Sequence, residues 1–72
     1  MLNNDVLRSL RFMLDISDAK VAEIAALGGL EISSKSISSF LKKEDEDGYT
    51  LCSDEVLAHV LDGLVILRRG RD

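Results

Sequence analysis

The feature that most constrains the fold of this chain is the helical spacing of its apolar residues. Leucine, isoleucine, valine and alanine recur at intervals of three and four positions, which is the pattern of amphipathic helices. There is no proline to interrupt a helix, and only three residues are aromatic. The sequence therefore predicts an all-α fold, a compact four-helix domain that spans residues 1–72 as one unit.

Polar caps and glycines locate the four helices along the chain. The second helix is expected to stop at Gly28, because glycine is a strong C-terminal signal. The predicted helices cover about residues 4–14, 18–28, 34–43 and 54–69, with a loop at 44–51. Their expected N-caps are Asn3 or Asn4, Ser17, Ser33 or Ser34, and Ser53.

The first and fourth helices each carry an apolar stripe that should face the core. In the first helix the stripe consists of Leu2, Val6, Leu10 and Met13, with Leu7 and Leu14 beside them. In the fourth helix one side holds Leu57, Val60, Leu61, Leu64 and Arg68.

The fourth helix is apolar on a second side as well. Residues 64–67 (LVIL) are apolar right round the helix, and Ile66 falls opposite the main stripe. A helix that is apolar on two sides is normally buried on two sides, and a glycine allows another helix to approach closely. Either one small core wraps around this helix or the helix forms a second interface. The sequence favours the interface, with the candidate residues Phe12, Gly63, Val65, Ile66 and Leu67.

The chain is short for a stable domain. A core of 72 residues rarely supplies more than about 3–5 kcal/mol, and the one cysteine, Cys52, cannot form an internal disulfide. We therefore expect stabilisation by a partner, either a second identical chain in a two-fold homodimer or a second copy of the domain. A single cysteine also favours a cytoplasmic location.

The net charge of −4 is concentrated in one segment. Residues 44–55 carry six of the 13 acidic side chains and no basic one. An acidic total therefore leaves room for a local surface that binds nucleic acid. No apolar run approaches the roughly 18 residues of a membrane span, and the first residues lack the layout of a secretory signal. We expect neither a membrane protein nor a secreted one.

Residues 18–43 resemble a helix-turn-helix, in which the second helix enters the major groove of DNA. Lysines on that helix can bind phosphates, and serines can donate to phosphate or base. The turn is longer than the usual three or four residues, and the face offers no Arg, Asn or Gln for bidentate base contacts. A structural helix pair with a solvated face is therefore favoured over DNA binding. The candidate nucleic-acid contacts are Lys35, Ser39, Lys42 and Lys43, supported by Arg8 and Arg11 of the first helix.

Phe12 lies off the stripe of the first helix, between two arginines and Asp15. An aromatic ring flanked by arginines can stack on a base. Burial by a neighbouring helix or a partner chain is the commoner role for such a residue, and we favour it here.

The chain lacks a convincing catalytic or metal-binding set. Cys52 and His59 are the only classical nucleophile and base, and no third group that would orient them is evident. The sequence at 45–48 (DEDG) fits a calcium loop only if Lys43 takes the first ligand position, which a lysine cannot fill. One histidine and one cysteine are too few for a zinc site. We therefore expect no enzyme, no metal and no cofactor.

Several blocks of the sequence, in order and over nearly the whole chain, resemble the YehS-like bacterial family, whose members share a domain of unknown function (DUF1456). The resemblance implies no activity and no catalytic residue. It implies a domain that members typically hold in two tandem copies, so this chain is expected to be a single-copy relative or the first half of a longer protein. The blocks are residues 3–12 (NNDVLRSLRF), 14–18 (LDISD), 40–46 (FLKKEDE), 52–54 (CSD), 61–64 (LDGL) and 69–70 (RG).

These observations favour a non-catalytic, cytosolic protein-interaction domain. The alternative is a nucleic-acid-binding regulator that uses the helix pair at 18–43. A third and weaker hypothesis is a small hydrolase or transferase at Cys52 and His59.

Overall fold

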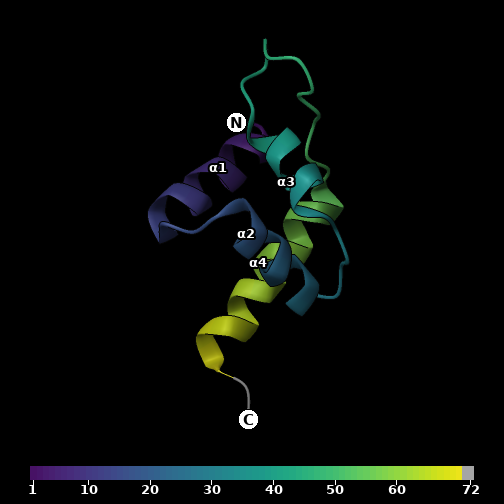
Figure 1. Ribbon diagram of the computed structural model, residues 1–72. Coiled ribbons are helices and arrows are strands. Elements are labelled where there is room, and N and C mark those ends of the chain that lie inside the picture. The colour runs from purple at the N-terminus through teal and green to yellow at the C-terminus, as the bar shows by residue number, and fades with distance from the viewer. Residues whose placement is uncertain (71–72) are drawn as a thin grey trace.

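The structure, a computed structural model that describes residues 1–70, is all-α, as the sequence predicts. No strand occurs among these residues, and the last two positions of the predicted domain lie outside them. Figure 1 shows α2 crossing α4 near the middle of the molecule, with α1 and α3 beside them. The helices are α1 (Asn3–Leu14), α2 (Asp18–Leu27), α3 (Ser34–Leu41) and α4 (Asp54–Arg69).

Three of the four predicted N-caps are confirmed. Ser17, Ser33 and Ser53 each accept a hydrogen bond from the backbone N–H three residues later. The fourth prediction is wrong, because α1 begins one residue earlier with Leu2 as its N-cap. The carboxylate of Asp5 accepts the Leu2 backbone N–H at 3.1 Å, so the first turn is capped from inside the helix.

The predicted end of the third helix at Lys43 is also wrong. The helix stops at Leu41, and Lys42 already has extended backbone angles (φ −72°, ψ 163°). The connection to α4 therefore occupies residues 42–53 and extends beyond the body of the molecule (Figure 1).

The core lies where α2 packs against both α3 and α4, with α1 closing one side. Val21, Ile24 and Ala25 of α2 occupy its centre, and one or two residues of every other helix reach it. The remaining buried hydrophobic residues are Leu7, Ile37, Phe40, Cys52 and Val60.

Two glycines allow the close crossing of α2 and α4. A Cβ atom at Gly28 would overlap the carbonyl oxygen of His59, and one at Gly63 would overlap the carbonyl oxygen of Ile24. Backbone therefore touches backbone at this crossing, which only glycine permits. Gly63 is buried inside the chain.

The crossing sets the rotation of α4 and corrects its predicted stripe. Because Gly63 must face α2, the buried side is centred on Val60 and Gly63, and Leu61 turns outward. The predicted stripe of α1 is confirmed only in part, since Val6 and Leu10 are half-buried. Leu7 faces the core, whereas Leu2 and Leu14 are exposed and Met13 is 70% exposed. The C-terminal end of α1 extends past the elements that could cover it.

A buried amide attaches the long connection to α1. The side chain of Asn4 is 1% exposed and donates to the carbonyl oxygens of Phe40 (3.0 Å) and Thr50 (2.8 Å). Its oxygen accepts the backbone N–H of Cys52 at 2.9 Å. One side chain thus joins the end of α3, the end of the connection and the first turn of α1.

Candidate interaction surface

The C-terminal half of α4 leaves apolar side chains in solvent. Beyond its crossing with α2, the helix continues past the rest of the molecule (Figure 1). Val65 is 51% exposed and Ile66 is 36% exposed, and Leu61 and Leu67 are also exposed. These residues point to different sides of the helix, with Val65 and Ile66 on the side away from Val60 and Leu67 towards α2. A helix end that is apolar on several sides is normally covered. We call Leu61, Val65, Ile66 and Leu67 the α4 apolar surface.

An open groove lies beside the α4 apolar surface. It has a volume of about 480 Å³ and runs between one face of α2 and the end of α4. Its walls are mainly apolar, and Lys20 and Glu23 at its edge form an ion pair at 3.9 Å. The lining residues are Lys20, Glu23, Ile24, Ala26, Leu27, Leu67 and Gly70.

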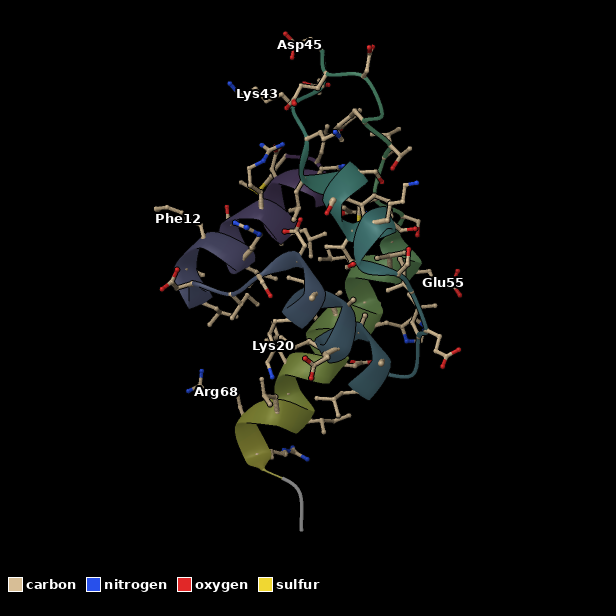
Figure 2. The ribbon with its side chains drawn as sticks, in the orientation of Figure 1. Phe12, Lys20, Lys43, Asp45, Glu55 and Arg68 are labelled. Atoms are coloured by element: carbon tan, nitrogen blue, oxygen red, sulfur yellow. The ribbon has the colours of Figure 1, made fainter. Side chains whose placement is uncertain are left out.

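The structure exposes four of the five predicted interface residues and buries one. Val65, Ile66 and Leu67 belong to the α4 apolar surface, and Phe12 on α1 is 82% exposed and points away from the body of the molecule (Figure 2). Gly63 is the exception, because it is buried at the crossing with α2, where its lack of a side chain lets the two backbones touch. The sequence correctly indicates a close helix approach at Gly63 but assigns it to the wrong neighbour.

Charged residues surround the exposed end of α4. Lys20 and Arg68 lie on the same side of the molecule near this end, whereas Lys43 and Asp45 lie at the opposite end (Figure 2). Asp62 and Arg69 are exposed on α4 itself. Among residues 1–70 there are three ion pairs, and none of them involves Asp62, Arg68 or Arg69.

Four of the six predicted nucleic-acid contacts gather between α1 and the end of α3. Arg8, Arg11 and Lys42 line one hollow, and Arg8 and Lys43 line a second. Acidic groups line the same hollows, so the cations do not form an uninterrupted basic patch. These acidic residues are Asp5, Asp18, Glu44, Asp45 and Glu46.

Both arginines are already engaged within the chain. Arg8 lies 3.4 Å from the Asp5 carboxylate and donates to the carbonyl oxygen of Lys42 at 2.9 Å. The Arg11 Nε lies 2.7 Å from the Asp18 carboxylate. Phosphate binding would have to compete with these contacts.

The other two predicted contacts lie apart from this group. Lys35 is exposed in the first turn of α3 and lines neither hollow. The Ser39 hydroxyl donates a hydrogen bond to the carbonyl oxygen of Ser36 at 2.6 Å. It also forms a hydrogen bond with the Thr50 hydroxyl at 2.6 Å. Ser39 therefore attaches the connection to α3 and does not present a free hydroxyl.

One charged cluster was not predicted from the sequence. Asp18, in the first turn of α2, accepts hydrogen bonds from Ser38 of α3 and from Arg11 of α1. The Ser38 hydrogen bond and, after it, the Arg11 guanidinium hold the pKa of the Asp18 carboxyl below its ordinary value of 3.8. The sequence pattern does not reveal this cluster, because the partners of Asp18 lie on two other helices.

Cys52 and His59 occupy different environments and make separate contacts. Cys52 is 5% exposed in the core, and burial raises the pKa of its thiol, with the nearby Asp54 adding to the effect. The His59 Nδ1 lies 2.7 Å from the carbonyl oxygen of Gly28, at the C-terminal end of α2.

Within residues 1–70 no three His, Cys, Asp or Glu side chains are grouped so as to hold a metal ion. None of the described helices is long and apolar enough to cross a membrane.

Comparison with known proteins places the chain in a family. Residues 3–70 match the family described as "Protein of unknown function (DUF1456)". The chain belongs to this family. It is also similar to the "Uncharacterized protein YehS" of Escherichia coli (strain K12), with 43% identity over 72 residues. That alignment covers the whole chain and 46% of YehS, so the chain spans less than half the length of this DUF1456 relative. No solved structure matches the chain.

Proposed function

We propose that this chain is a non-catalytic, cytoplasmic protein-interaction domain that binds its partner through the α4 apolar surface. One observation carries the proposal: Leu61, Val65, Ile66 and Leu67 stand exposed on a helix that extends past its neighbours. The interior placement of Cys52 supports a non-catalytic role, because a nucleophile must be accessible to its substrate.

The small size of the domain explains why covering the α4 apolar surface would be favourable. Within residues 1–70 the core consists of eight buried hydrophobic residues with seven partly buried ones packed against them, and a core of this size gives a domain little stability on its own. Covering roughly 50–100 Å² of apolar area on each surface residue, at about 25 cal/mol per Å², contributes on the order of 1–2.5 kcal/mol per residue. Part of this gain is offset by the entropy lost on association.

The partner that needs the fewest assumptions is a second identical chain. A two-fold homodimer requires one self-complementary patch, and α4 would lie at its centre. Phe12 and Met13 of α1 expose further apolar area.

Sedimentation velocity at protein concentrations from about 1 to 100 µM tests the proposal. The wild-type chain should shift from the 7.9 kDa monomer towards a dimer as concentration rises. Ile66→Asp should reduce dimerisation because it places a charge in the interface, whereas Glu46→Ala, in the exposed acidic connection, should leave it unchanged. If the wild-type chain remains a monomer at about 100 µM, the homodimer is contradicted.

Nucleic-acid binding is the second candidate function. The gathering of Arg8, Arg11, Lys42 and Lys43 around two adjoining hollows favours it, and their acidic neighbours oppose it. Titration with duplex and single-stranded DNA at low and moderate salt tests it. Binding that weakens with salt and is lost in the double variant Lys42→Glu, Lys43→Glu would support this function. An unchanged signal at tens of micromolar protein would count against it.

A further inference from the structure

The outer side of α4 carries a short, ordered pattern of charge and hydrophobicity. Because an α-helix turns about 100° per residue, positions 62, 65, 66 and 69 share the side opposite the buried Val60, within an arc of about 100°. All four residues at these positions are exposed. Along the helix axis the side reads Asp62, then Val65 with Ile66, then Arg69.

This pattern is complementary to itself when one copy is reversed. If two α4 helices lie antiparallel and are centred between residues 65 and 66, each Asp62 faces the Arg69 of the other copy. Val65 of each chain then faces Ile66 of the other, and every contact occurs twice, as a two-fold axis requires. A parallel arrangement would instead place acid against acid and base against base, which is repulsive.

The groups needed for this pairing are not used elsewhere in the described chain. Neither Asp62 nor Arg69 takes part in any of the three ion pairs or in a side-chain hydrogen bond among residues 1–70. The apolar pair between them includes Val65, half of whose surface is exposed. Charge complementarity therefore selects a second copy of this chain, antiparallel, as the occupant of this side of α4.

We infer that the homodimer, which rests on the function proposed above, is an antiparallel pair of α4 helices in which Asp62 of each chain binds Arg69 of the other. The two ion pairs fix the direction and register of the helices, and the apolar residues between them supply most of the affinity.

Charge reversal tests this arrangement. Asp62→Arg places two arginines opposite each other at both ends of the interface, and Arg69→Asp does the same with two carboxylates. Each variant alone should raise the dimer Kd about tenfold, and the effect should shrink at high salt. An equimolar mixture of the two variants should form a heterodimer with close to wild-type affinity, because both contacts are again between opposite charges. The double variant Asp62→Arg, Arg69→Asp should also dimerise like the wild type.

Control variants distinguish the antiparallel register from the proposed dimerisation itself. Asp47→Arg makes the same charge change in the exposed connection and should not alter the Kd. Circular dichroism of each variant reports whether the helices still form, and Asp62→Asn, which removes charge without reversing it, should weaken the dimer only a few-fold. If the wild-type chain dimerises but the mixed variants do not associate better than either variant alone, the antiparallel register is wrong while the interaction function stands. If the wild-type chain does not dimerise at all, both the antiparallel register and the homodimer are wrong.

Discussion

At the scale of single residues, the most consequential polar group is the amide of Asn4. It satisfies three backbone groups from two separate segments, at Phe40, Thr50 and Cys52. Buried backbone groups that lose their partners cost far more than a hydrogen bond gains, since they have given up water on folding. Among the side chains that hold the connection before α4, Asn4 is therefore the one whose loss leaves the most backbone groups unpaired.

Asn4→Leu should lower the free energy of unfolding by about 3 kcal/mol, because the leucine leaves those backbone groups unpaired. Asn3→Leu is the matched control. Asn3 also donates across to Cys52 and Asp54, but from a partly exposed position where water can replace it, so its loss should cost under about 1 kcal/mol. Urea unfolding of the two variants provides the measurement. Equal losses would show that Asn4 has no special role.

The Asp18 cluster predicts a dependence of stability on pH. The Ser38 hydrogen bond and the Arg11 guanidinium lower the pKa of Asp18 in the folded chain, so the unfolded chain holds the proton more tightly. The stability due to Asp18 is therefore present above about pH 4 and is lost as the pH falls through the lowered folded pKa.

Asp18→Asn should remove this part of the acid dependence. Its unfolding free energy should fall less steeply than that of the wild type as the pH drops below about 4. Ser38→Ala removes the largest cause of the shift and should change the slope in the same direction. Denaturant unfolding at a series of pH values measures the slopes. Parallel curves for wild type and Asp18→Asn would contradict the assignment.

At the scale of the elements, the crossing of α2 and α4 organises the molecule. Glycine in the middle of a helix is unfavourable by about 1 kcal/mol relative to alanine. Gly63 is retained at this cost because its neighbour across the crossing is the backbone of Ile24, which cannot move aside as a side chain would. The close approach holds α2 and α4 together at the crossing, and the last turns of α4 extend beyond α2 (Figure 1).

Gly63→Ala should destabilise the fold by about 1–3 kcal/mol, although alanine is the better helix former, because the added methyl group forces the two helices apart. Ala58→Gly makes the reverse exchange at an exposed position of the same helix and should cost about 1 kcal/mol through helix propensity alone. Thermal unfolding at low protein concentration measures both. A Gly63→Ala variant more stable than the wild type would show that the crossing is looser than described.

At the scale of the whole molecule, apolar surface and charge are unevenly distributed. The molecule measures 42 by 22 by 20 Å, with the acidic connection at one end and the exposed turns of α4 at the other. A small core and a large exposed apolar surface on one helix together favour association, since burial in an interface adds to the stability of each chain.

The melting temperature should therefore rise by several degrees as the protein concentration increases from about 5 to 500 µM, because mass action favours the dimer. Ile66→Asp should melt at a lower temperature that no longer depends on concentration. Differential scanning calorimetry over this range makes the comparison. A wild-type melting temperature that stays constant would mean that the domain is stable without a second copy.

The sequence alone determined the helices and most of their starts. Helix-favouring residues, the absence of proline and the serines at 17, 33 and 53 are local signals, and local signals decide where a helix forms. The family resemblance, carried by blocks along the chain, was equally available and is confirmed. The two-sided apolarity of residues 64–67 likewise pointed to the exposed end of α4.

Only the tertiary structure decided how each helix is rotated and which polar groups meet. Asn4 resembles a helix cap in the sequence, and its buried role becomes visible only when Phe40 and Cys52 are brought to it. Leu61 and Gly63 exchange their expected sides because a backbone contact with α2 overrides the apolar stripe. Periodicity fixes which residues share a face of a helix, but which face is buried depends on neighbours that lie far away in the sequence.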